Sequence, residues 1–240
     1  MLVTSFRAYR QRNRAVLVGT VIAAVLFAFQ SILGALVVKL DLPPTMVTVH
    51  LGTAMLLLGA LLFAYVGAVY RPAVTYVRDH VTLLMYTTTV SLLIILTGAL
   101  VRGAGATLAC IDWPLCNGEL LPTGQGPLQV VHMTHRFAVA ALGVLMALLV
   151  WYVFRSGRPA STRQFALAAF VLYLAQAAVG AVFVLQAAAP LWGTLHVGLA
   201  SLTWASLVVL SILETANNGA LNLGSSEVEW HQQSGSRLPN

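Results

Sequence analysis

Charged residues are scarce in this sequence. Asp, Glu, Lys and Arg make up 8% of the 240 residues, whereas hydrophobic residues make up 59% and the mean hydropathy is +0.85. About a quarter of the residues in a soluble domain are charged, so this composition excludes an ordinary soluble domain. It is typical of an integral membrane protein.

Acidic residues are absent from six long apolar stretches, which are residues 15–38, 45–70, 81–101, 129–154, 164–186 and 191–213. Each can cross a hydrocarbon core of about 30 Å at a rise of about 1.5 Å per residue. The first exceeds the apolar segment of a secretory signal peptide, about 7 to 15 residues, so we expect it to remain as an anchor. We therefore predict an all-α membrane protein with a six-helix transmembrane bundle.

Basic residues are few and lie mainly at one side of the predicted bundle. Lys and Arg in short loops mark the cytoplasmic side. That side holds Arg7, Arg10, Arg12, Arg14, Arg71, Arg78, Arg155, Arg158 and Arg163, and the other side holds Lys39 and Arg102. The net charge of +6 therefore reflects topology and indicates no nucleic-acid partner.

The same charge distribution gives the orientation of the chain. We predict a multi-pass protein of the cell (inner) membrane, in contact with lipid, with both termini cytoplasmic. Residues 1–14 form a basic cytoplasmic N-terminus. Residues 214–240 form a polar tail that is expected to be disordered, because it is low in apolar residues.

One segment of the chain is repeated. QSILGALVVKLDLPPTMVTVHLGTA, from Gln30, aligns without gaps with QAAVGAVFVLQAAAPLWGTLHVGLA, from Gln176, at an offset of 146 residues. The matched pairs are Gln30 with Gln176, Gly34 with Gly180, Pro44 with Pro190, Thr48 with Thr194, His50 with His196 and Gly52 with Gly198. A fixed period of this kind indicates a repeated structural unit.

Four predicted helices fit within one period. Residues 81–213 then form a complete four-helix repeat with an outer loop at residues 102–128, and residues 15–70 form a partial first repeat. The counterpart of the third and fourth helices would lie before Met1. We interpret the sequence as one and a half copies of a four-helix repeat, lacking the first hairpin of an eight-helix arrangement.

Three histidines have similar depths in the predicted bundle. His50 and His196 each lie six residues after a proline that begins a helix, about 9 Å into the membrane, and His135 lies eight residues after Pro127, about 12 Å in. Such a histidine is often only a buried group hydrogen-bonded to a neighbouring helix. Recurrence at one depth in both copies favours a function, because two neutral histidines from different helices can ligate a heme iron. His135 and His196 can form such a pair.

Arg136 is a charged residue inside the fourth stretch, and no acidic residue of the six stretches neutralises it. One interpretation is that heme propionates pair with Arg136 and with Arg102 near the outer face. The alternative is that Arg136, near one end of its helix, extends to the membrane interface. Gln30 and Gln176 are interpreted as bridges between helices, with no assigned chemistry.

Cysteine occurs only at Cys110 and Cys116, both in the outer loop. In an oxidising compartment this pair can form a disulfide, which is either a labile functional bond or a plain staple of the loop. A zinc site that adds His132 and His135 is the alternative. Its C-x5-C and H-x2-H spacings fit a Cys2His2 site poorly.

Taken together, these segments resemble the heme A synthase family. TGALVRGAGATLACIDWPLCNGELLP followed by VVHMTHRFA is similar to the family's Arg-containing loop, cysteine pair and His-Arg helix start. The repeated hairpin is similar to the other hairpin of each half, and the resemblance runs from about Val16 to Leu213. It implies that one half binds the substrate heme O and the other a heme b cofactor. The reaction oxidises the C8 methyl of heme O to a formyl group for terminal oxidases.

By this resemblance, His135 and His196 are the axial ligands of heme b, His50 is one ligand of the substrate heme, and the outer loop carries the second-half cysteine pair. The sequence departs from the family in lacking the first-half hairpin and, with it, the partner histidine of His50. His132 also stands where the family has an acidic residue. We expect a homo-oligomer, a second chain or an upstream segment to supply the missing hairpin.

Three functions remain open from the sequence. The first is a heme A synthase-like oxidoreductase, with terminal oxidase assembly factors as partners. The second is a non-catalytic heme b membrane subunit for electron transfer or oxidase assembly. The third is a heme-free structural subunit, which would leave Arg136 unpaired in the bilayer.

Overall fold

The computed structural model describes residues 14–41, 43–70, 81–218 and 221. Within these residues it holds six α-helices and no strand, which confirms the predicted all-α fold. All six are long and apolar enough to cross a membrane. They are α2 (Arg14–Lys39), α3 (Pro44–Val69), α4 (Val81–Gly103), α5 (Pro127–Arg155), α6 (Ala160–Leu185) and α7 (Pro190–Asn217).

The helix ends differ from the predicted boundaries chiefly at the end of α7. The prediction ended this helix at residue 213, but it continues to Asn217. Glu214 is buried and pairs with Arg158 at 3.4 Å, and it accepts a hydrogen bond from Thr162 at 3.0 Å. A paired carboxylate can be buried in a helix, so the prediction of a disordered tail from residue 214 was wrong for its first residues. The rest of that tail, apart from residues 218 and 221, lies outside the described residues, as do residues 1–13 and the loop at 71–80.

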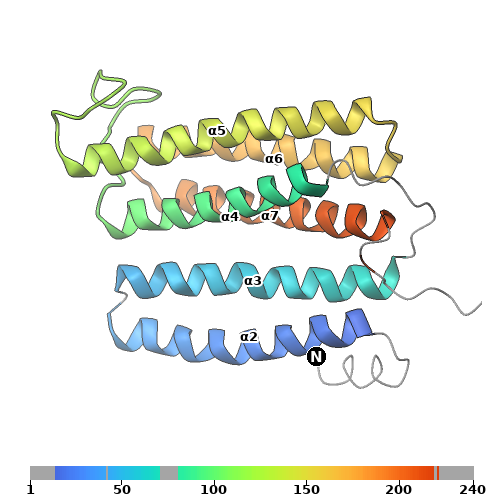
Figure 1. The fold of residues 1–240 in the computed structure, drawn as a ribbon. Coiled ribbons are helices and arrows are strands. Elements are labelled where there is room, and N and C mark those ends of the chain that lie inside the picture. The colour runs from blue at the N-terminus through green and yellow to red at the C-terminus, as the bar shows by residue number, and fades with distance from the viewer. Residues whose placement is uncertain (1–13, 42, 71–80, 219–220, 222–240) are drawn as a thin grey trace, which may run out of the picture.

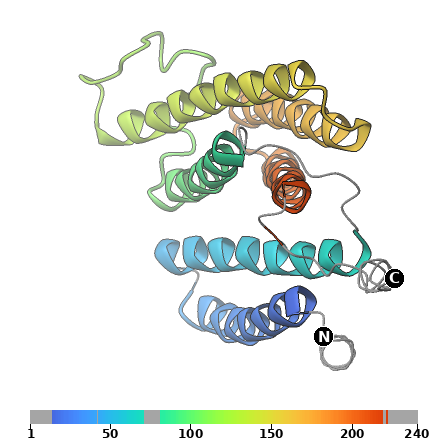
Figure 2. The same cartoon turned by 45° about the vertical axis from the view of Figure 1, so that its right-hand side comes forward.

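Helices α4 to α7 form a four-helix ring. Helix α4 packs against α5 and α7, and α6 packs against the same two helices. Helices α5 and α7 are not in backbone contact, so they stand diagonally across the ring from each other. Figures 1 and 2 show this group as one side of the molecule.

The hairpin of α2 and α3 lies beside this ring. Helix α3 packs against both α4 and α7, whereas α2 packs only against α3 among the described helices. Figure 1 shows α2 as the outermost helix on that side. The two segments that carry the repeated sequence each form a packed helix pair, because α2 packs against α3 as α6 packs against α7.

The interior of the ring is apolar and closely packed. Its fully buried side chains include Leu84, Met146, Leu149, Leu207 and Leu210. Lipid is as apolar as these side chains, so their contribution comes mainly from close van der Waals packing. The result is a closely packed apolar frame, and the polar side chains lie near the end of it where the loop between α4 and α5 begins.

Helices α3, α5 and α7 each begin with a proline at the first helical position. Proline is tolerated there because its missing N–H would have no partner within the helix. All three begin at the same end of the molecule, where the long loop between α4 and α5 also lies (Figure 1). The predicted common depth of His50, His135 and His196 follows from this arrangement.

Candidate functional site

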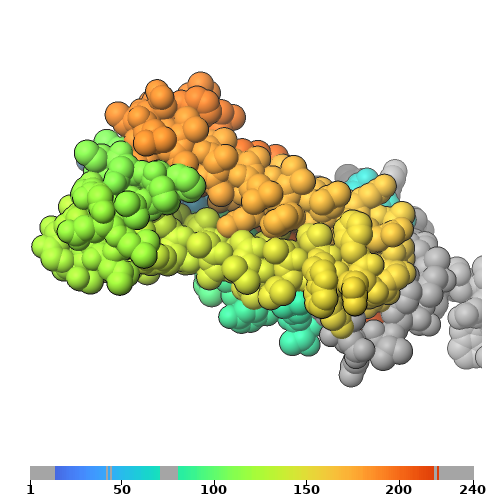
Figure 3. All heavy atoms as spheres, turned by 90° about the horizontal axis from the view of Figure 1, so that it is seen from above, coloured from blue at the N-terminus to red at the C-terminus, as the bar shows by residue number. Residues whose placement is uncertain are grey.

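His135 on α5 and His196 on α7 belong to the two diagonal helices of the ring. Both side chains are partly buried, and His196 lies within electrostatic range of His135. Seen from the side of α5 and α6, this end of the molecule is hollowed between the loop-bearing start of α5 and the end of α6 with the start of α7 (Figure 3).

The protonation pattern of His196 follows from its hydrogen bond. Its Nδ1 lies 2.9 Å from the backbone carbonyl oxygen of Gln176 on α6. A carbonyl oxygen only accepts, so Nδ1 carries the proton and donates. In a neutral imidazole the lone pair is then on Nε2, which is the nitrogen that a metal ion needs.

His135 has the same pattern through a different partner. Its Nδ1 lies 2.8 Å from the hydroxyl oxygen of Thr97 on α4. That hydroxyl also lies 2.7 Å from the carbonyl oxygen of Ile94, to which it donates its one proton. The Thr97 oxygen must therefore accept from Nδ1–H of His135, which leaves the lone pair on Nε2. Neither Nε2 atom has a hydrogen bond among the described residues.

Each ring also rests against a glycine of a neighbouring helix. A Cβ added at Gly98 of α4 would lie 3.2 Å from Cε1 of His135, and one added at Gly180 of α6 would lie 2.8 Å from Cε1 of His196. Real Cβ atoms essentially never approach to 2.8 Å. The missing side chains thus leave the space that the two rings occupy.

His50 on α3 has a different environment, although it aligns with His196 in the repeat. The amide nitrogen of Gln30 donates to the backbone oxygen of His50 at 3.0 Å and lies 3.1 Å from its Nε2. Gln30 therefore donates to Nε2, and the proton of His50 is on Nδ1. That Nδ1 is buried without a hydrogen-bond partner among the described residues. Gln30 joins α2 to α3, as predicted for a bridging glutamine.

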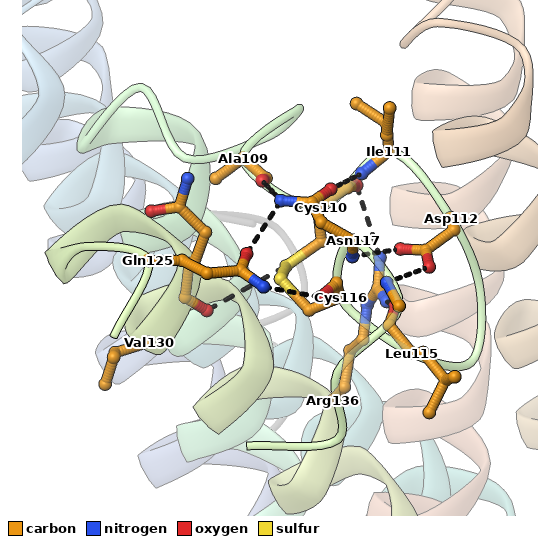
Figure 4. The surroundings of a disulfide bond; sticks show 12 residues. Ala109, Cys110, Ile111, Asp112, Leu115, Cys116, Asn117, Gln125, Val130 and Arg136 are labelled. Carbon is orange, nitrogen blue, oxygen red and sulfur yellow. Dashed lines mark hydrogen bonds between the residues drawn. A yellow bond between two sulfur atoms is a disulfide. The ribbon is translucent and has the colours of Figure 1, made fainter. Parts of the chain in front are cut away.

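Arg136 is directed to the loop between α4 and α5. Its guanidinium donates hydrogen bonds to the backbone oxygens of Leu115, Pro114 and Cys110, as Figure 4 shows for the labelled residues Leu115 and Cys110. Loop carbonyls thus accept hydrogen bonds from Arg136 in the structure, an arrangement that the sequence did not predict. Arg102 is exposed at the end of α4. Binding of propionates by either residue stays a prediction.

The outer loop is closed by the predicted disulfide between Cys110 and Cys116, whose Cα atoms are 4.5 Å apart. Both sulfur atoms are buried, and their bond removes them as zinc ligands. The loop contains a cis peptide bond before Pro114. The side-chain amide of Asn117 donates to the backbone oxygen of Ala109 at 3.0 Å, which joins the two residues that flank the disulfide-bonded cysteines (Figure 4).

Asp112 orders the tip of this loop. Its carboxylate accepts hydrogen bonds from the backbone N–H groups of Asn117 at 2.6 Å and Gly118 at 2.8 Å, whose φ angles are 52° and 84°. Desolvation raises the pKa of Asp112. The hydrogen bonds from these N–H groups and the nearby charge of Arg136 lower the pKa by more than desolvation raises it, so the net pKa lies below 3.8. The carboxylate is ionised at neutral pH and fixes the turn.

Sequence reasoning missed Thr97 and Gly98 as parts of the site. The repeat did align Gly34 with Gly180, and each lies against the histidine of its own hairpin, with Gly34 at 3.3 Å from Cε1 of His50 by the same measure. The recurrence of this glycine in both copies was a signal that could have identified Gly180 as part of the site. His132 is buried, and its Nδ1 has no hydrogen-bond partner among the described residues.

Comparisons with known proteins agree on one group. A family model described as cytochrome oxidase assembly protein (COX15-CtaA) matches residues 1–208. Proteins named heme A synthase from Bacillus cereus (strain AH187), Bacillus anthracis (strain A0248) and Bacillus thuringiensis subsp. konkukian (strain 97-27) are each 32% identical over 126 residues. The match covers 51% of this chain and 40% of each relative, so it spans less than half the length of these relatives.

Proposed function

The chain belongs to the cytochrome oxidase assembly protein (COX15-CtaA) family, and on that basis we propose that it acts as a heme A synthase-like oxidoreductase. In this proposal it oxidises the C8 methyl of heme O to a formyl group for terminal oxidase biogenesis. The names of the relatives support this reaction. The chain is a multi-pass membrane protein with six membrane-length helices in its described part.

The observation that carries the proposal is the pair of imidazoles on the diagonal helices. His135 and His196 each hold a proton on Nδ1, and the lone pair on each Nε2 accepts no hydrogen bond from the described residues. With glycines behind both rings, this donor set fits a heme with two histidine ligands. A heme b bound here would supply one-electron transfer.

The residues of the chain prepare this site in three ways. Thr97 and the carbonyl of Gln176 fix the tautomers of the two rings. Gly98 and Gly180 leave the space that the rings need. The apolar helices around them exclude water, which strengthens the electrostatic effect of these hydrogen bonds.

In this proposal His50 is the ligand for the substrate heme O, and a helical hairpin packed against α2 and α3 completes its site. The repeat supports this at two positions where α6 and α7 are buried in the ring but their counterparts on α2 and α3 are exposed. Tyr173 is 5% exposed and its counterpart Phe27 is 57% exposed, and Ser211 is 6% exposed and its counterpart Tyr65 is 66% exposed. A second copy, another chain or a further segment of this polypeptide would provide the hairpin.

We further propose that the protein lies in the cell membrane with both termini cytoplasmic. The outer loop then faces an oxidising compartment, where the disulfide between Cys110 and Cys116 is stable. Arg155, Arg158 and Arg163 lie at the opposite end of the helices, as the positive-inside rule requires.

The reaction is tested in membranes that express this chain together with a source of heme O. Extracted hemes are separated by chromatography, and heme A is expected to appear at the expense of heme O. The matched control is His135→Ala, which should give no heme A while the chain is still inserted in the membrane. Bound heme b with heme O left unconverted would contradict the proposed reaction.

A second candidate function is a non-catalytic heme b subunit for electron transfer or oxidase assembly. The contrast between the His135 and His196 pair and His50, whose Nε2 accepts from Gln30, favours it specifically. Pyridine hemochrome analysis of the purified chain separates the two functions. One heme per chain that survives His50→Ala, without heme A formation, supports the second function, and two hemes per chain contradict it.

A further inference from the structure

The two candidate ligands are held by different kinds of acceptor. The Nδ1–H of His196 donates to a backbone carbonyl, which every residue at position 176 would provide. The Nδ1–H of His135 donates to the side chain of Thr97, which only a few residue types could replace. The orientation of one ring is thus built into the helix backbone, whereas the orientation of the other depends on a single hydroxyl.

The hydroxyl group of Thr97 is itself held in place by a hydrogen bond within α4. Its hydroxyl proton is directed to the Ile94 carbonyl oxygen at 2.7 Å, which is the usual bond of a threonine in a helix. The oxygen lone pairs therefore face outward, and one of them accepts from His135 at 2.8 Å. The next residue, Gly98, has no side chain between the two helices, and a Cβ there would lie 3.2 Å from Cε1 and 3.5 Å from Nε2 of His135.

We propose that Thr97 and Gly98 are positioning residues for His135, with Thr97 fixing its Nδ1–H tautomer and raising the electron donation of Nε2 to a bound heme iron. This inference rests on the proposed heme site. A hydrogen bond from the far nitrogen of a histidine ligand increases the basicity of the ligating nitrogen, and loss of such a partner typically weakens metal binding about 10- to 100-fold.

The test compares three variants of the full chain purified from membranes with its heme. Thr97→Val keeps the shape and removes the hydroxyl, and Thr97→Ser restores the hydroxyl. Thr87→Val is the matched control, because Thr87 is a threonine of the same helix, more buried than Thr97, whose hydroxyl bonds only to the Leu83 carbonyl among the described residues. The measurements are the rate of heme loss to apomyoglobin and the midpoint potential of the heme.

Thr97→Val is expected to lose heme about tenfold faster and to have a higher midpoint potential, because a less basic ligand stabilises ferric iron less. Thr97→Ser and Thr87→Val should match the parent chain. Equal potentials and heme-loss rates for Thr97→Val and Thr87→Val would overturn the role of Thr97, even where the parent chain holds heme.

A second measurement does not depend on heme. In the chain with ¹⁵N-labelled histidine, the His135 signals, identified by their absence in His135→Ala, should report the Nδ1–H tautomer in the parent and a mixture in Thr97→Val. A parent chain that binds no heme but shows this change contradicts the proposed function and leaves the tautomer role of Thr97 supported. An unchanged tautomer in Thr97→Val overturns the inference directly.

Discussion

The hairpin of α2 and α3 and the hairpin of α6 and α7 share a sequence pattern but differ in their surroundings. Both have a glutamine and a glycine in the first helix and a histidine six residues into the second. Helices α6 and α7 are packed against α4 and α5, whereas α2 contacts only α3 among the described helices, and Phe27 on α2 and Tyr65 on α3 are exposed.

The two histidines also differ in their hydrogen bonds. His196 donates from Nδ1 to a backbone oxygen of its partner helix, so its Nε2 is available. His50 accepts at Nε2 from the Gln30 side chain, and its Nδ1 is buried without a partner among the described residues. The repeated pattern therefore determines where a ring lies, but the hydrogen bond within each hairpin determines which ring nitrogen is left to bind a metal.

The largest difference between the two hairpins is expected when their histidines are replaced. His196→Ala is expected to abolish the reduced-minus-oxidised heme spectrum of the purified chain, because one of two axial ligands is removed. His50→Ala should retain the spectrum of the heme held by His135 and His196. Loss of the whole spectrum in His50→Ala would show that the two hairpins are not independent.

Substitution of three glycines is expected to affect heme retention to different degrees in the two hairpins. A Cβ at position 180 would lie 2.8 Å from the His196 ring, one at position 34 would lie 3.3 Å from the His50 ring, and one at position 198 meets nothing within 4 Å. Gly180→Ala is thus expected to weaken heme retention about tenfold, and Gly34→Ala and Gly198→Ala should have little effect. Heme titration of membranes carrying the three variants gives the order, and equal losses at positions 180 and 198 would contradict it.

Packing against a neighbouring hairpin is expected to give a smaller difference between the two regions, in the free energy of unfolding. The Tyr173 hydroxyl donates to the Val139 carbonyl oxygen at 2.7 Å. Tyr173→Phe is expected to lower the free energy of unfolding by about 0.6 to 1 kcal/mol, measured by denaturation in detergent. The counterpart Phe27 is exposed, so Phe27→Tyr should leave stability unchanged. A similar loss in both variants would mean that Phe27 is also covered in the assembled protein.

The smallest effect is expected in the outer loop, which belongs only to the region with the complete ring. Because the pKa of Asp112 is lower in the folded chain than its ordinary value of 3.8, the carboxylate stabilises the loop above that value, and this stabilisation is lost as the pH falls through the lower folded pKa. Hydrogen exchange at the amides of Asn117 and Gly118, corrected for intrinsic rates, should therefore accelerate in acid. In Asp112→Asn this pH dependence should disappear, and its persistence would assign the effect to another group.

Much of the fold follows from the sequence because membrane-spanning helices need long apolar stretches without charge. The common level of His50, His135 and His196 also follows, since each lies a fixed number of residues after a proline that begins a helix. The disulfide between Cys110 and Cys116 was predicted because the two residues lie six positions apart in one loop.

The remaining features depend on which faces of the helices pack together and on the path of the loop between α4 and α5. Thr97 meets His135 only because α4 and α5 pack with those faces together, and no periodicity in so apolar a helix specifies its rotation. The contacts of Arg136 depend on the path of the loop between α4 and α5. The extension of α7 depends on Arg158, which reaches Glu214 from the turn between α5 and α6.

The contact of α3 with α7 has a consequence for biosynthesis. Gly59 lies against Trp204, and the Tyr70 hydroxyl donates to Asn217 at 2.7 Å, so an early helix is held by the last one. Helix α3 leaves the ribosome well before α7 and must wait in the lipid until α7 has been made. A nascent chain halted ahead of α7 would contain three of the four ring helices, and its first hairpin would have only α4 to hold it.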